Sequence, residues 1–145
     1  MEITSKNISI KRTARYFLSG GNKTPKILMF VLHGYGMPAY HFLQEFTESE
    51  NENTLIVSPE GLSRFYTKGF YGNIGASWMT SEGRENEIQD YVNYLDEVYK
   101  EVLSTLETKP EKIVFIGFSQ GGATVTRWAV KGKSEADILI IHSSD

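Results

Sequence analysis

The chain has 145 residues, 40% apolar and 23% charged, with a formal net charge of -3, which is ordinary for one globular domain. The mixed charges argue against nucleic acid as the main partner, and the absence of cysteine excludes disulfides, thiolate catalysis and cysteine-ligated metals. Residues 1–10 lack the apolar run of a signal peptide, and no apolar stretch approaches the roughly 18 residues that cross a membrane. We therefore expect one domain over residues 1–145, located in the cytoplasm, with no membrane partner.

Short apolar runs alternate with helical patterns along the chain, which indicates an α/β fold with a mostly parallel sheet and crossover helices. Two short edge strands with a break near 11–13 are expected within 8–18. The runs that predict strands buried on both faces are 27–32, 54–57, 113–118 and 138–141. The patterns that predict helices cover 38–48, 82–106 and 121–130.

The segment 61–80 interrupts this alternation. It contains five aromatic residues and four glycines without a clean period, and we expect a long loop. Loops of this length in compact domains are usually functional, although the aromatic residues could instead pack on the sheet. Both interpretations stay open for the segment, and only Trp78 favours the functional one.

A G-x-S-x-G sequence, Gly117-Phe118-Ser119-Gln120-Gly121, follows a predicted strand and precedes a predicted helix. This context is typical of the nucleophile elbow, where a serine projects from a tight strand-to-helix turn and flanking glycines relieve crowding. A turn with a purely geometric role is one alternative. A phosphate-binding loop is another, but the Lys-Ser/Thr pair that it requires does not follow the glycines. Ser119 is therefore the candidate nucleophile.

His33-Gly34-Tyr35-Gly36 follows the predicted strand 27–32. Beside a nucleophile elbow, a loop after an early strand supplies one oxyanion-binding N–H, and the residue after the nucleophile supplies the other. The backbone N–H groups of Tyr35 and Gln120 are the predicted donors. Both loops belong to the carboxyl edge of the sheet, where open α/β sheets bind ligands.

These motifs resemble those of the phospholipase/carboxylesterase family of α/β hydrolases, which includes acyl-protein thioesterases. The resemblance extends from about Thr13 to Ser144. Further segments that match the family, or its bacterial carboxylesterase branch, are Val57–Gly61, Ser63–Tyr66, Gly75–Met79 and Arg127-Trp128.

The resemblance implies an α/β-hydrolase fold, with helices on both faces of the sheet, that lacks its last strands. It implies a serine carboxylesterase or thioesterase that forms an acyl-enzyme on Ser119, with Tyr35 and Gln120 as oxyanion donors. Trp78 and Met79 would line the substrate cleft. The expected partner is a small ester or thioester, no cofactor is expected, and the scattered histidines give no indication of a metal site.

The rest of a catalytic triad is missing from the expected places. In this fold an acid and then a histidine follow the serine. Glu135 and Asp137 precede the strand 138–141, at the wrong end of the sheet, and His142 comes too early. Asp145 is the last residue. We therefore expect that the chain is incomplete at its C-terminus and alone has at most a trace of activity.

Two alternatives to the esterase interpretation remain open at this stage. The chain could be a non-catalytic remnant of a hydrolase that binds a partner, or the complete protein could be a lipase or peptidase. His33 precedes the nucleophile in the chain and is expected to hold its own loop by local hydrogen bonds. Acyl length, the choice of ester or thioester and the oligomeric state are not predicted.

Overall fold

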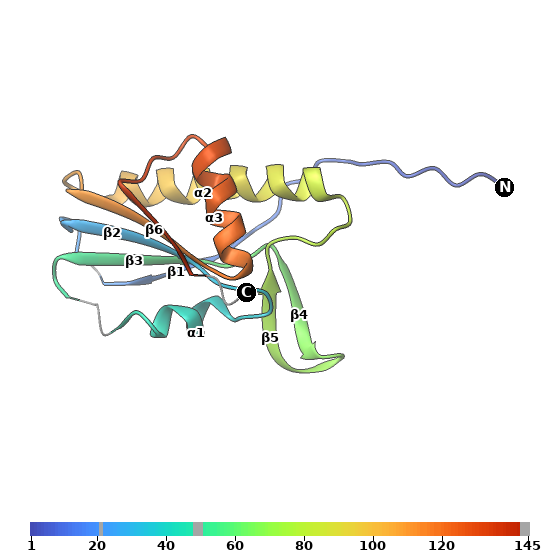
Figure 1. The fold of residues 1–145 in the computed structure, drawn as a ribbon, viewed down its shortest axis with the longest axis horizontal. Coiled ribbons are helices and arrows are strands. Elements are labelled where there is room, and N and C mark those ends of the chain that lie inside the picture. Colours follow the sequence, from blue (N-terminus) through green and yellow to red (C-terminus); the bar gives the residue numbers. More distant parts are fainter. Residues whose placement is uncertain (21, 48–50, 143–145) are drawn as a thin grey trace.

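A computed structural model describes residues 1–20, 22–47 and 51–142 (Figure 1). Its centre is a five-stranded sheet of order β1-β3-β2-β6-β7. The strands are β1 (Tyr16–Ser19), β2 (Ile27–Leu32), β3 (Thr54–Pro59), β6 (Lys112–Phe118) and β7 (Ile138–His142). Only β1 runs antiparallel to its neighbour. The predicted mostly parallel sheet is confirmed.

Helices cover both faces of this sheet (Figure 1). Helix α1 (Ala39–Gln44) lies on one face, and helices α2 (Arg84–Thr105) and α3 (Gln120–Lys131) lie on the other. The core on the α2 and α3 side contains Phe30, Phe115 and Trp128, and the ring of Trp128 stacks on Phe115 with centroids 3.9 Å apart. Residues of β2 point into both cores, which explains its uninterrupted apolar run. None of the described helices is long and apolar enough to cross a membrane.

Strand β7 is present where the sequence predicts it, but the prediction that it is buried is wrong. The side chains of residues 138–141 are between 42% and 51% exposed. Within the described residues β7 is one of the two edge strands of the sheet, paired with β6 on one side and contacted by α3. An apolar run identifies a strand, whereas its burial depends on neighbours that the described residues do not supply.

The segment 61–80 is not a loop but an antiparallel hairpin. Strands β4 (Ser63–Lys68) and β5 (Tyr71–Ser77) form a separate two-stranded sheet that projects from the carboxyl edge of the main sheet (Figure 1). A register shift between Tyr66 and Lys68 breaks the alternation of side chains, which is why the segment shows no period of two. Gly69, at φ +78°, occupies the turn, as hairpin turns require.

The ends of two other elements also differ from expectation. Only the second of the two short edge strands forms, because residues 1–15 have no regular structure and are exposed. Helix α1 ends at Gln44 rather than at residue 48, which lies outside the described residues. Helices α2 and α3 agree with their predicted ranges to within two residues at each end.

Candidate active site

Ser119 occupies the turn that joins β6 to α3, at the carboxyl edge of the sheet. Its backbone angles are φ 55° and ψ -117°, and within residues 1–20, 22–47 and 51–142 no other non-glycine residue has a positive φ. Such angles cost free energy and persist only where surrounding contacts hold them. The Ser119 N–H donates to the His142 carbonyl oxygen over 2.9 Å, and the residue itself is exposed. The sequence-predicted nucleophile therefore stands on a strained, accessible turn.

Glycines on both sides of Ser119 permit this turn by close backbone contact. A Cβ added at Gly117 would lie 2.2 Å from the Gly121 carbonyl oxygen, and one added at Gly121 would lie 2.1 Å from that of Leu32. Real Cβ atoms do not approach backbone oxygens this closely, so any larger residue would force β6, α3 and β2 apart. The two glycines of the motif thus bring the serine turn against the end of β2.

The loop that follows β2 lies directly beside this turn. A Cβ at Gly34 would lie 3.2 Å from the carbonyl oxygen of Phe118, the residue before the nucleophile. Among the described residues, nothing accepts a hydrogen bond from the backbone N–H of Tyr35 or Gln120. The structure thus brings together the loop and the turn that the sequence assigns to the oxyanion hole, and the donor roles of Tyr35 and Gln120 remain a prediction.

The Gln120 side chain clamps the turn to the end of β5, a contact that the sequence analysis did not predict. Its Oε1 accepts the Trp78 N–H at 3.0 Å, and its Nε2 donates to the Met79 carbonyl oxygen at 2.9 Å and to Ser77 Oγ at 3.2 Å. The motif drew attention only to the backbone of Gln120. A glutamine directly after the serine was the available signal, because its side chain can donate and accept at once.

Replacing Gln120 with alanine should lower the free energy of unfolding by about 1–3 kcal/mol, because the Trp78 N–H would lose its acceptor and the Met79 carbonyl would keep only Ser77 Oγ as a donor. Urea unfolding of the variant measures this loss. Gln89→Ala is the matched control, since its side chain bonds only Asn93 on the exposed face of α2, and it should change stability by less than about 0.5 kcal/mol. Equal losses of stability in the two variants would contradict the inference that the Gln120 side chain holds the turn to the end of β5.

Trp78 is buried, with an exposed fraction of 2%. Its Nε1 donates to the His33 carbonyl oxygen at 2.8 Å, and its ring stacks on that of His33 with centroids 5.0 Å apart. Met79 is half-buried, and its sulfur accepts from Arg127. Both residues therefore lie beside the serine turn, Trp78 within the core, and their role as cleft lining remains a prediction.

His33 holds its loop from inside the protein, as expected. Its Nε2 accepts the Gly61 N–H at 2.9 Å, so the ring proton resides on Nδ1, which lies 2.7 Å from the Gly34 carbonyl oxygen. Burial is the main cause that lowers the pKa of His33 below its usual value, and it outweighs the hydrogen bond to Gly34, which favours the charged form. The neutral imidazole therefore holds the loop in place through its hydrogen bonds to Gly34 and Gly61.

The lowered pKa of His33 predicts that stability falls as the pH drops below about 6.5, the unfolded value. There the unfolded chain binds a proton that the folded chain resists, so the free energy of unfolding decreases by up to about 1.4 kcal/mol per pH unit. Urea unfolding between pH 7.5 and 5.5 measures this slope. His33→Gln should flatten it, whereas His41→Gln, which removes an exposed histidine, should not. The same slope in all three proteins would contradict the assignment.

The acids and the histidine that follow Ser119 do not complete a triad around it. Asp137 Oδ2 accepts the Ile113 N–H at 2.8 Å, at the opposite end of β6 from the serine, and the nearby Glu135 carbonyl accepts from Tyr99. The His142 ring packs edge-on against Phe118. Within the described residues no side chain bonds Ser119 Oγ, and no group of three His, Cys, Asp or Glu side chains could hold a metal ion. Asp145 lies outside the described residues.

Comparison with solved structures identifies the fold. The carboxylesterase of Bacillus cereus matches with 18% identity and a TM-score of 0.62, over 90% of this chain and 60% of that one. A phospholipase/carboxylesterase from Dyadobacter fermentans matches with 18% identity and a TM-score of 0.60, over 96% of this chain and 66% of that one. Acyl-protein thioesterase 2 of Zea mays matches with 21% identity and a TM-score of 0.54, over 78% of this chain and 49% of that one.

These likenesses confirm the α/β-hydrolase fold. The chain spans 62% and 60% of the length of two esterases that match it at a TM-score of 0.62. A search of curated proteins finds no match. The sequence model of the phospholipase/carboxylesterase family matches residues 16–145, and the chain therefore belongs to the phospholipase/carboxylesterase family.

Proposed function

We propose that this protein hydrolyses carboxylic esters or thioesters through an acyl-enzyme on Ser119. The observation that carries the proposal is the strained, exposed Ser119 turn packed against the loop of Tyr35. Strain at an exposed serine between a strand and a helix costs stability and serves no packing purpose, which favours a chemical role. The likeness to an esterase, a carboxylesterase and an acyl-protein thioesterase points to the same reaction class.

In the proposed reaction Ser119 Oγ attacks the carbonyl carbon of the substrate and gives up its proton to a general base. The N–H groups of Tyr35 and Gln120 stabilise the oxyanion that forms, and the alcohol or thiol leaves with the proton. Water then hydrolyses the acyl-enzyme by the same route. No described side chain bonds Ser119 Oγ, and the proposal assigns neither the general base nor the carboxylate that would orient it to a particular residue.

The proposed substrate is a small ester or thioester, and its acyl group would contact Met79 and the neighbouring end of the hairpin. Trp78 would support this wall from within the core, through its bond to the His33 carbonyl. The mechanism needs no cofactor, because serine, imidazole and backbone amides perform every step. A single domain and a cytoplasmic location remain predictions from sequence alone.

Active-site labelling tests the nucleophile directly. The protein and its Ser119→Ala variant would be incubated with a fluorophosphonate and examined by intact and peptide mass spectrometry. We expect one adduct on Ser119 in the parent and none in the variant, because phosphonylation needs an activated serine oxygen. An adduct on another serine, or equal labelling of the two proteins, would contradict the proposal.

A non-catalytic binding role is the second candidate, and the exposure of β7 favours it. An outer strand with apolar side chains on both faces is a surface for pairing with another chain. If the complete product neither labels nor turns over p-nitrophenyl acetate and butyrate, while the 145-residue chain associates in sedimentation experiments, the binding role replaces the esterase. Monomeric 145-residue chain would remove this second candidate.

A further inference from the structure

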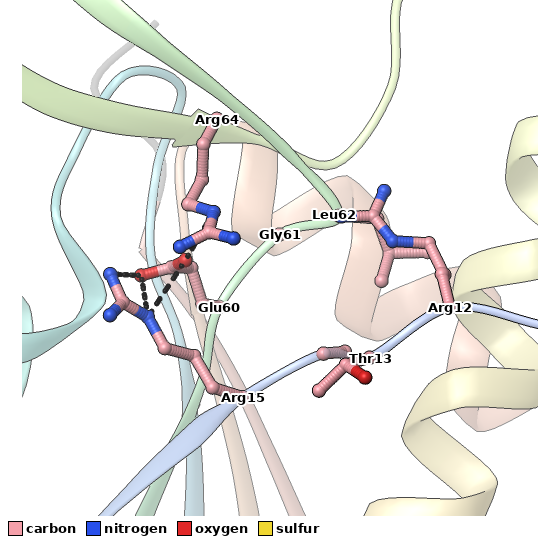
Figure 2. A pocket seen from close by; sticks show the side chains of 8 residues that line it. Arg12, Thr13, Arg15, Glu60, Gly61, Leu62 and Arg64 are labelled. Carbon is pink, nitrogen blue, oxygen red and sulfur yellow. Dashed lines mark hydrogen bonds and ion pairs between the residues drawn. The ribbon is translucent and has the colours of Figure 1, made fainter.

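Three arginines surround a small cavity at the end of β3, outside the serine turn. The cavity has a volume of about 130 Å³, and Arg12, Arg15, Glu60 and Arg64 contribute its charged lining (Figure 2). This is well below the roughly 300 Å³ at which pockets for whole small molecules begin. The size suits one charged functional group rather than a complete cofactor.

The strand register assembles this arginine pocket. Tyr16 pairs with Pro59 across β1 and β3, so Arg15 and Glu60 are neighbours at the point where β3 ends, and the Glu60 N–H donates to the Arg15 carbonyl. Arg64 follows Glu60 by four residues at the start of the hairpin. Residues from the N-terminal arm, the main sheet and the hairpin therefore converge on one carboxylate.

The Glu60 carboxylate is fixed between two guanidinium groups. Its side chain is 8% exposed, against 54% for Arg15 and 50% for Arg64. Arg15 Nε donates to both carboxylate oxygens at 3.1 Å, and Arg64 Nε lies 3.6 Å from Oε1. A buried carboxylate normally needs such partners, and it holds both arginines in place while leaving part of each guanidinium exposed.

The positive charge of the pocket exceeds what Glu60 neutralises. Three arginines against one carboxylate leave a formal excess of two positive charges. Within the described part of the chain, Arg12 forms no ion pair or hydrogen bond, and Figure 2 shows it across the Gly61–Leu62 segment from the other three side chains. Glu87 and Asp90 of α2 line an adjoining cavity together with Arg12, and neither carboxylate forms an ion pair with it. Guanidinium groups with free N–H donors are the preferred protein ligands of carboxylates and phosphates.

The pocket opens at the same edge of the sheet as Ser119. Phe30 of β2 pairs with Val57 of β3 on one side and with Phe115 of β6 on the other. Gly61 and Ser119 each follow these paired residues by four positions, so the two lie level at this edge of the sheet. Their backbones are two strand spacings apart, which is about 10 Å.

We propose that the arginine pocket binds a small oxyanion, the carboxylate or phosphate group either of a free ion or of the ester substrate. The pocket stands on its own contacts, so this inference does not depend on the esterase proposal. If the group belongs to the substrate, the pocket selects esters whose far end is negatively charged.

Titration with disodium succinate and with sodium phosphate tests the pocket in the 145-residue chain carrying Ser119→Ala, which separates binding from hydrolysis. Sodium chloride keeps the ionic strength constant, and heteronuclear NMR and thermal unfolding report binding. Arg12→Gln combined with Arg64→Gln should weaken binding by about tenfold or more, because charged hydrogen bonds are lost. Arg15 is kept so that Glu60 remains paired. Arg64→Gln alone serves if the double variant is unstable.

Arg84→Gln is the matched control, because Arg84 pairs only with Glu85 on the exposed surface of α2, and it should bind like the parent. Failure of the parent to bind either anion, equal binding by the double variant, or the same response to sodium chloride would each overturn the proposal.

The source of the anion is settled on the complete gene product by the ratio of kcat/KM for the p-nitrophenyl hemiester of succinic acid to that for p-nitrophenyl butyrate. A ratio that falls about tenfold in the Arg12 and Arg64 double variant places the anion on the substrate. An unchanged ratio, with anion binding still dependent on the arginines, assigns the pocket to a free ion.

Discussion

Replacing Ser119 with alanine in the complete gene product should lower kcat for p-nitrophenyl butyrate by on the order of 10⁴-fold or more, with little change in KM. The serine supplies the attacking oxygen, and no other group on the turn can replace it, so only binding and oxyanion stabilisation would remain. Stopped-flow kinetics should also show that the burst of p-nitrophenol, which reports acyl-enzyme formation, disappears.

The substitution also removes a hydroxyl group at a residue with a positive φ, so a folding defect must be separated from a chemical one. Urea unfolding should show that Ser119→Ala changes stability by less than about 1 kcal/mol, because the Oγ bonds no described residue. Ser104→Ala is the matched control, on the exposed face of α2, and should retain full activity. Comparable activity in Ser119→Ala and the parent would remove the esterase proposal.

The sheet could be predicted from sequence because buried parallel strands have a simple pattern. The run 27–32 is flanked by β3 and β6 and covered by helices on both faces, so all six of its residues are apolar. The hairpin could not be predicted in the same way, since a register shift and solvent exposure remove the alternation from residues 63–77. The prediction that β7 is buried was wrong for a related reason, because the burial of a strand depends on the segments that pack beside it and not on its own sequence.

The serine turn and its neighbouring loop were predictable because the backbone geometry demands glycine at fixed positions around Ser119. The side-chain network around the turn was not predictable. Gln120 contacts Trp78, and Arg15 contacts Glu60, across 42 and 45 residues of chain, and these contacts depend on where the hairpin and β1 meet the sheet. The spacing of residues in a motif reflects local backbone geometry, whereas contacts between such distant residues depend on how whole helices and strands are arranged.

Gly121→Ala should lower the free energy of unfolding by about 3 kcal/mol or more, the upper end for an overpacked site. The new Cβ would lie 2.1 Å from the Leu32 carbonyl oxygen and 2.5 Å from that of His33. Both are backbone atoms, so no side-chain rotation can relieve the contact, and the N-terminus of α3 must move away from β2. For a domain of this size the melting temperature should fall by about 10 °C.

Gly122→Ala is the matched control, one residue further along the same helix. Its Cβ would meet Ile141 Cγ2 at 2.9 Å, and the nearest backbone atom lies at 3.6 Å. Because Ile141 is 51% exposed on β7, its side chain can turn aside, and alanine favours the helix by about 1 kcal/mol over glycine. The free energy of unfolding of Gly122→Ala should therefore lie within about 1 kcal/mol of the parent value.

If the two variants have the same free energy of unfolding, contact between α3 and β2 does not set the stability of the serine turn. If only Gly121→Ala is destabilised and fluorophosphonate labelling of the complete product slows with it, the same contact both supports the fold and holds Ser119 in its strained position.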